Sequence, residues 1–140
     1  MRWKNPVMAS TDFALRGVPT DPRQLELWLQ HAAGFILFED VSHYALERLD
    51  PTLDDATKSL VTRAVNDAVY GLMMVLDGVS GSLRNDEVAV DLSMTVRLRR
   101  GDTVITEMDL QVGDGMCMGY HSWVAGDFGT HPPAATRTSP

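Results

Sequence analysis

The longest regular pattern in the sequence is TLDDATKSLVTRAVNDAVYGLMMVLDG, residues 52–78. Its apolar side chains recur every three or four residues, the spacing that places them on one face of an α-helix. This apolar face consists of Ala56, Leu60, Val61, Ala64, Val65, Ala68, Val69, Leu72, Met73 and Leu76. A helix of about 25 residues is about 37 Å long, whereas a domain of this size has a radius of gyration of about 14 Å. The sequence therefore predicts one long helix that crosses the domain and supplies much of its core.

Both ends of this predicted helix carry recognisable boundary residues. Thr52 is a suitable N-cap with Asp55 three residues later, and acidic residues are favourable near the positive end of the helix dipole. Gly78 suits the left-handed residue that follows a last helical turn. Val79 would then fold back onto Met74 in a Schellman-type stop.

A second helical segment precedes the long helix. Asp21 followed by Pro22 and Gln24 is typical of a helix start, with an N-cap, a proline in the first turn and a capping-box glutamine. The apolar spacing is interrupted within residues 34–39, so this segment is either one helix or two helices with a break there. The helical pattern stops before Pro51, because proline disfavours the α conformation in the residue before it. We expect two or three helices between residues 22 and 78.

The apolar period changes from helical spacing to strict alternation after residue 87. Residues 88–98 and 103–112 each alternate apolar and polar side chains, as half-buried strands do. The loop 100–102 contains a glycine and would join them as a hairpin. Keeping both apolar sets on one face places Leu98 opposite Val104 and Val96 opposite Thr106.

These patterns together predict a single α+β domain over residues 1–129. Two or three N-terminal helices are followed by a three-stranded antiparallel β-meander, residues 87–125, packed on the long helix. The third strand is assigned to Met116–Val124, and a short edge strand to residues 12–18. Residues 130–140 have too little apolar content to fold and are predicted to form a disordered tail.

Composition narrows the classes of partner. There are 19 acidic and 12 basic residues, which give a net charge of −7. Such a chain is repelled by nucleic acid and by anionic membranes, so neither is the expected partner. The sequence shows neither the run of about 18 apolar residues that a membrane span needs nor the apolar region of a signal peptide. We expect a soluble, cytoplasmic protein.

Six acidic residues fall within 17 positions and are relieved only by Arg48. They are Glu39, Asp40, Glu47, Asp50, Asp54 and Asp55. Such a run is most often a solvated helix face, but it could also bind a basic surface of another protein. Glu39, His43 and Glu47 would share one helix face, where a solvated charged line is favoured over metal ligands that need carboxylates from a facing helix.

The densest set of reactive side chains lies near the C-terminus. Cys117, His121, Asp127 and His131 could hold a metal ion, and a cysteine beside a histidine could act as a nucleophile. On a strand, however, Cys117 and His121 would be about 13 Å apart, which is too far for proton transfer. A buried cysteine and a structural histidine are therefore favoured. As Cys117 is the single cysteine, it cannot form a disulfide within the chain.

The sequence contains none of the common catalytic or nucleotide-binding motifs, and it indicates no particular cofactor. In build, the chain resembles immunity proteins, secretion chaperones and phage inhibitors of host defence, without a family motif that would assign functional residues. We therefore expect a non-enzymatic module that binds another protein through the acidic surface or the outer face of the sheet. The alternatives are a small metal- or cysteine-dependent enzyme, or a small-molecule binder with a methionine-lined apolar pocket. The unpaired edge of a small sheet also allows a homodimer.

Overall fold

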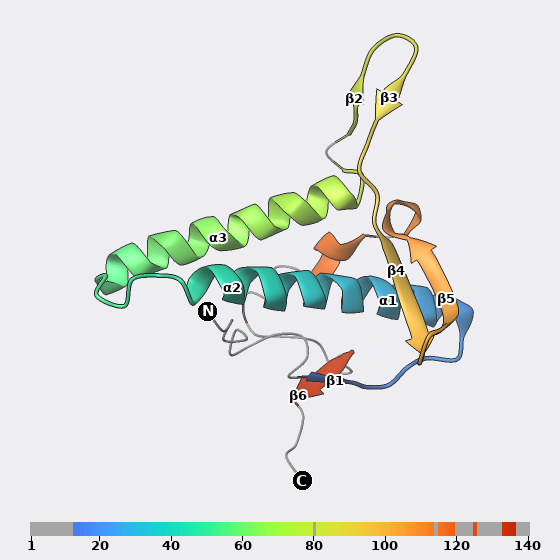
Figure 1. The fold of residues 1–140 in the computed structure, drawn as a ribbon, viewed down its shortest axis with the longest axis horizontal. Coiled ribbons are helices and arrows are strands. Elements are labelled where there is room, and N and C mark those ends of the chain that lie inside the picture. Colours follow the sequence, from blue (N-terminus) through green and yellow to red (C-terminus); the bar gives the residue numbers. More distant parts are fainter. Residues whose placement is uncertain (1–12, 80, 114, 120–124, 126–132, 137–140) are drawn as a thin grey trace.

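The computed structural model describes residues 13–79, 81–113, 115–119, 125 and 133–136. It combines helices with small antiparallel ribbons, which agrees with the α+β class expected from the sequence (Figure 1). In chain order the elements are β1 (Phe13–Leu15), α1 (Pro22–Leu37), η2 (Phe38–Ser42), α2 (His43–Leu46), α3 (Asp55–Leu76), β2 (Leu83–Arg84), β3 (Ala89–Val90), β4 (Thr95–Arg100), β5 (Thr103–Asp109), η3 (Leu110–Val112), η4 (Met116–Gly119) and β6 (Ala134–Thr136).

The elements α1, η2 and α2 follow one another as a single helical rod, with η2 forming a π-helical turn (Figure 1). The rod begins as predicted. Asp21 is the N-cap, its carboxylate accepts the backbone N–H of Gln24 at 3.0 Å, and Pro22 occupies the first turn. Backbone hydrogen bonds in the π turn span one residue more than in an α-helix, which changes the face presented by the residues that follow.

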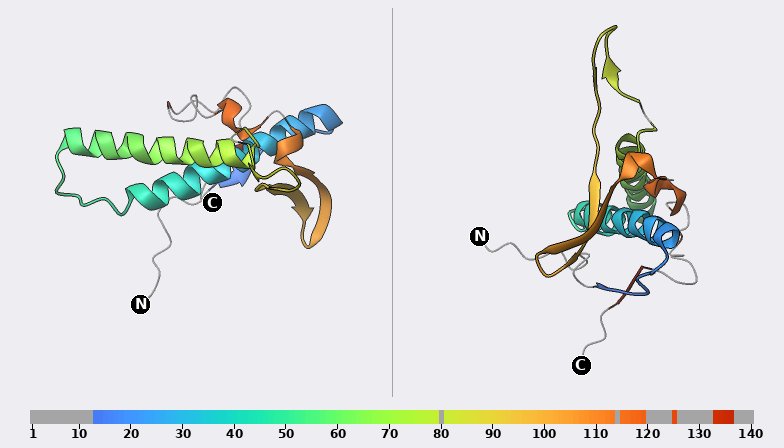
Figure 2. Two further views of the ribbon diagram at one scale, coloured as in Figure 1. Left: turned by 90° about the horizontal axis from the view of Figure 1, so that it is seen from above. Right: turned by 90° about the vertical axis from the view of Figure 1, so that its right-hand side faces the viewer.

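Helix α3 lies beside this rod (Figures 1 and 2). Its N-cap is Asp54 and not the predicted Thr52. The carboxylate of Asp54 accepts the N–H of Thr57 at 2.7 Å, whereas Thr52 donates to Asp50 in the preceding turn. The C-terminal stop is confirmed, because Gly78 has a φ of 80° and the N–H of Val79 donates to the carbonyl oxygen of Met74 at 3.0 Å.

The core is small and forms where α1, α3 and the C-terminal turns meet. Its buried members are Ala33, Val69, Met73, Leu110 and Met116. The prediction that the whole apolar stripe of α3 is buried is wrong, since five of its members are exposed, namely Ala56, Leu60, Ala64, Ala68 and Leu72. The physical reason is that the stripe is wider than the contact that α3 makes with the rod, and no other described element covers the remainder.

The strands β4 and β5 form an antiparallel hairpin that lies against α1, and not against the long helix as the sequence predicted. Val96 pairs with Met108 and Leu98 with Thr106, so the predicted register is wrong by two residues. Two local features produce this shift. The hairpin loop is one residue shorter than predicted, because Arg100 pairs with Thr103, and a β-bulge follows Leu98. A shift of two keeps the same side chains on the same face.

The prediction of one half-buried strand over residues 88–98 is wrong in its first half. Regular pairing in β4 starts only at Thr95, and Leu83–Arg84, which precede the predicted strand, form β2. Strands β2 and β3 form a hairpin that stands away from the helices (Figures 1 and 2). The apolar residues of this segment lie outside the core because, in the part of the chain that the structure describes, no element packs against the hairpin.

The predicted three-stranded meander is not confirmed, because residues 116–119 of its third strand form the 3₁₀ turn η4. The physical reason is that Asp77 at the end of α3 accepts the N–H groups of Met116 and Cys117, at 2.8 and 3.0 Å, and these groups are then unavailable for a sheet. The remainder of this predicted strand, residues 120–124, lies outside the described residues.

The two ends of the chain meet in a third ribbon. Strand β1 confirms the short N-terminal strand and pairs with β6, with Phe13 opposite Thr136 and Leu15 opposite Ala134. The disorder predicted for residues 130–140 is therefore wrong for β6. The prediction used the low apolar content of this segment, which does not show that β1 supplies hydrogen-bond partners for its backbone. The N–H of Arg16 extends this pairing by donating to the carbonyl oxygen of Pro133 at 2.9 Å. Within the described ranges, no helix has the length and apolar character required to cross a membrane.

Candidate functional site

Most of the acidic residues predicted to bind a partner form an exposed corner between α2 and α3. Glu47, Asp50, Asp54 and Asp55 are exposed, and Asp40 is partly exposed. Hydrogen bonds from Thr52 hold the pKa of Asp50 below its usual value, and those from Thr57 do the same for Asp54. These carboxylates therefore stay ionised while they shape the turn and cap α3.

Glu39 lies beneath the surface and is only 5% exposed. Its Oε2 is 2.7 Å from Nδ1 of His43, as the four-residue spacing suggested. Burial raises the pKa of Glu39, and the nearby His43 partly opposes that shift. Ser42 is buried beside them, and its hydroxyl has no hydrogen-bond partner among the residues that the structure describes. Because Glu39 and Ser42 are shielded from solvent, they do not contribute to an exposed binding surface.

Cys117 is held in an environment that opposes ionisation. Its Sγ lies 2.9 Å from Oδ2 of Asp77. Burial, followed by the hydrogen bond and the charge of Asp77, raises the pKa of the Cys117 thiol from an ordinary 9.0 to about 12. Nucleophilic and metal-binding cysteines require a thiolate, so this arrangement favours a structural role. The other members of the predicted metal set, His121, Asp127 and His131, lie outside the described residues, and the described ones contain no cluster of three metal-ligating side chains.

Gln30 is a buried polar residue that the sequence pattern did not single out. Its Oε1 accepts the N–H of Gly115 at 2.6 Å, and its Nε2 donates to the carbonyl oxygen of Glu26 at 3.2 Å. A Cβ on Gly113 would lie 2.6 Å from this side chain, so glycine is needed for the close approach. A glutamine directly after Leu27, Trp28 and Leu29 in a helix, together with the Gly113-x-Gly115 pair, was the available signal. These contacts and those of Asp77 fasten the loop before η4 to α1 and α3.

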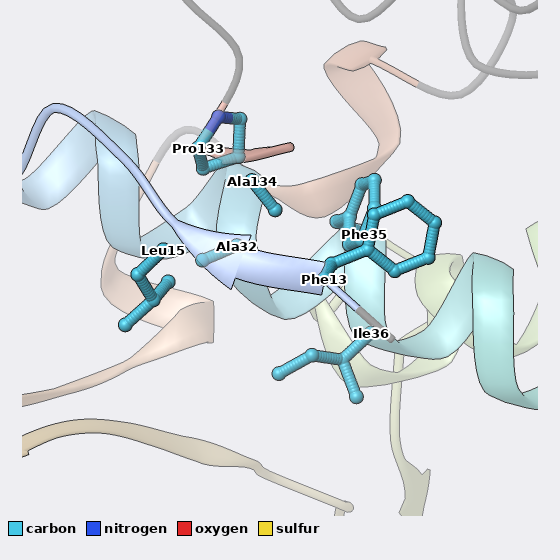
Figure 3. Close-up of a pocket in the computed structure, with 7 residues that line it drawn as sticks. All are labelled: Phe13, Leu15, Ala32, Phe35, Ile36, Pro133 and Ala134. Carbon is cyan, nitrogen blue, oxygen red and sulfur yellow. The ribbon is translucent and has the colours of Figure 1, made fainter. Parts of the chain in front are cut away.

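An apolar pocket lies between α1 and the β1–β6 ribbon (Figure 3). It has a volume of about 210 Å³. The seven residues that line it all have apolar side chains: Phe13, Leu15, Ala32, Phe35, Ile36, Pro133 and Ala134. Among the residues that the structure describes, this lining provides no general acid, nucleophile or metal ligand.

The pocket has an ordered aromatic side and an open aliphatic side. The rings of Phe13 and Phe35 meet edge to face, with centroids 4.9 Å apart and planes at 87°, which is a favourable aromatic geometry. Leu15 and Ile36 are both exposed. Pockets that enclose drug-sized molecules have volumes of about 300 Å³ or more, so this one suits a single aliphatic or aromatic side chain better than a whole ligand.

A second, more open groove of about 380 Å³ runs between α1 and β4. Met94 lines it, together with Ile36 and Leu37 of α1. It is the nearest counterpart of the methionine-lined pocket expected between sheet and helix, but the helix concerned is α1. Neither site could be located from the sequence, because one requires the pairing of β1 with β6 and the other the packing of β4 on α1.

Comparisons of this chain with protein families, with curated proteins and with solved structures found no match.

Proposed function

We propose that this chain is a non-enzymatic protein-binding module that receives one apolar side chain of its partner in the pocket between α1 and the β1–β6 ribbon. The observation that carries the proposal is the wholly apolar, solvent-open lining of that pocket. Interfaces commonly concentrate their binding energy in a few large side chains that fill such pockets. Leu15 and Ile36, exposed at this site, would become buried on binding and add to the affinity.

The acidic corner supports the same class of function at a different place on the molecule. Glu47, Asp50, Asp54 and Asp55 lie in and around the turn that joins α2 to α3 at one end of the helical rod, whereas β1 and β6 lie beside the middle of the rod (Figure 1). A cluster of ionised carboxylates attracts a partner with a basic surface and speeds its association without adding much affinity. We propose that this corner selects basic partners and that the pocket anchors them, in the cytoplasmic setting expected from the sequence.

The test is a selection of random linear peptides displayed on phage against the immobilised full chain. We expect enriched peptides to share one large aliphatic or aromatic residue. Ala32→Leu, which fills the pocket, should weaken a selected synthetic peptide about tenfold or more, corresponding to about 1.4 kcal/mol. The matched control is Ala64→Leu, the same change on an exposed face of α3.

Equal binding of the peptides to the wild type and to Ala32→Leu would contradict the proposed site. Enriched peptides without a large apolar residue would contradict it as well. Circular dichroism of both variants would confirm that neither substitution unfolds the chain.

A further inference from the structure

The hairpin formed by β2 and β3 exposes a row of apolar side chains that no described element of the chain covers. Val88, Val90 and Leu92 are 63%, 65% and 60% exposed. They occupy alternate positions and so belong to one face of an extended segment. An isolated two-stranded hairpin is marginal in water, and an exposed apolar row of this kind marks an interaction surface.

Strand β4 has a free edge. The N–H of Leu110 donates to the carbonyl oxygen of Met94 at 3.0 Å, so the even-numbered residues of this segment direct their backbone groups toward β5. The N–H and C=O groups of Thr95 and Arg97 therefore point away from β5. Among the described residues nothing pairs with this edge. The groove of about 380 Å³ between α1 and β4 is lined by Thr95 and Arg97.

The same argument applies to β3. The N–H of Asn85 donates to the carbonyl oxygen of Val88 at 3.0 Å, and Val90 pairs with Leu83. The backbone N–H and C=O groups of these two valines therefore point toward β2. The backbone groups of Ala89 and Asp91 consequently point away from β2. In both β3 and β4, the backbone N–H and C=O groups of the odd-numbered residues thus lie at an edge that no described strand pairs with.

We propose that two copies of this chain pair antiparallel through residues 88–98, so that the β2–β3 hairpin of each copy covers the groove between α1 and β4 of the other. A two-fold axis at Met94 would place Val90 opposite Leu98 of the second copy and Leu92 opposite its Val96. The apolar row of the hairpin would then share a face with the half-buried side of β4 and cover Leu37. The pairing is reciprocal, so the assembly closes as a dimer.

The charges on the other face agree with the same register. It brings Asp91 opposite Arg97 of the second copy, and Glu87 diagonal to Arg99. All four side chains are exposed, and none forms an ion pair within the part of the chain that the structure describes, although Arg97 is opposite Glu107 on β5. Opposite charges directly across a strand pair are stabilising and like charges are destabilising. The symmetric dimer contains the Asp91–Arg97 pair twice.

Native mass spectrometry and light scattering of the full chain test this assembly. We expect a mass of twice 15.4 kDa. Asp91→Arg and Arg97→Asp each create two like-charge pairs, so each should weaken the dimer about tenfold or more. The exposed Asp67→Arg on α3 is the matched control and should leave the dimer unchanged.

The decisive measurement mixes the two single variants. In the mixed dimer one pair joins the two substituted positions and the other is the native Asp91–Arg97 pair. Both pairs then carry opposite charges, so a heterodimer should form with an affinity near that of the wild type. The double variant D91R/R97D should likewise recover its homodimer.

A monomer at every concentration tested, a dimer indifferent to Asp91→Arg, or a mixture that fails to recover would each overturn the proposal. None of these substitutions changes a residue of α1, β1 or β6, and circular dichroism of each variant provides an independent check of folding.

Discussion

The carboxylate of Asp77, at the C-terminal end of α3, accepts the thiol proton of Cys117, with 2.9 Å between Oδ2 and Sγ. The same carboxylate accepts the backbone N–H groups of Met116 and Cys117. One side chain at the end of the long helix thereby orders η4 and, together with burial, opposes ionisation of the only cysteine.

This arrangement predicts an unreactive thiol. With its pKa raised from 9.0 to about 12, the fraction of Cys117 present as thiolate near pH 8 is about a thousandfold below that of an ordinary cysteine. We expect alkylation by iodoacetamide to be correspondingly slow in the folded protein and ordinary in urea. Asp77→Asn removes the negative charge and should accelerate the reaction. Rapid alkylation of the folded wild type would contradict the prediction.

The raised pKa of Cys117 also predicts a loss of stability in alkali. The unfolded thiol ionises near 9.0, whereas the folded thiol stays protonated until about pH 12. The contribution of Cys117 to the free energy of unfolding is therefore complete below pH 9 and declines as the pH rises toward 12. Urea unfolding across this range should show a shallower decline for Cys117→Ala than for the wild type.

The contact between Gln30 and Gly113 can be tested by a double-mutant cycle. Gln30→Ala leaves the buried N–H of Gly115 without its acceptor and should cost about 1–3 kcal/mol. Gly113→Ala brings a Cβ within 2.6 Å of Gln30 and should cost about 1–3 kcal/mol through overpacking. The double variant should lose less than the sum, by about 1 kcal/mol, because the shorter side chain relieves the clash.

Urea unfolding provides all four corners of this cycle. The control is Gly71→Ala, where an added Cβ meets nothing within 4 Å and helix propensity favours alanine. Strict additivity of the Gln30 and Gly113 effects would show that the two sites do not interact.

The burial of Glu39 predicts that the stability difference between Glu39→Gln and the wild type depends on pH. Because burial raises its pKa above the ordinary 4.5, the folded state binds this proton more tightly than the unfolded state does. Its contribution to the free energy of unfolding is greatest below pH 4.5 and is lost as the pH rises through the folded-state pKa. Glu39→Gln should therefore gain stability over the wild type at neutral pH and lose that advantage in acid.

The exposed Glu47 gives the matched control for this prediction. Glu47→Gln removes the same charge from an exposed position on the same stretch of chain. Thermal unfolding at a series of pH values measures both variants. A destabilised Glu39→Gln at neutral pH would mean that the attraction to His43 outweighs the cost of burial.

The parts of the fold that follow from neighbouring residues could be predicted. Asp21 and Pro22 start α1, Gly78 and Val79 end α3, and Gly101 turns the β4–β5 hairpin, because caps and tight turns depend on side chains a few positions apart. The two-residue error in register arose from a shorter loop and a bulge, neither of which alters the alternation of apolar residues.

The candidate sites could not be predicted, because each joins segments that are distant in sequence. The pocket requires β1 and β6 to pair, although the composition around Ala134 is typical of a disordered tail. Glu39 belongs to an acidic run, yet packing places it inside while Asp50 and Asp54 remain outside.

The pattern of residues thus established the long helix and its C-terminal stop, the start of α1, the β4–β5 hairpin and the acidic character, since these depend on period, turn chemistry and charge count. Tertiary structure established which part of each apolar face is covered. A helical or alternating period marks a face as apolar, but burial requires a surface to pack against it. Leu60 on α3 and Val90 on β3 obey the period and still remain exposed.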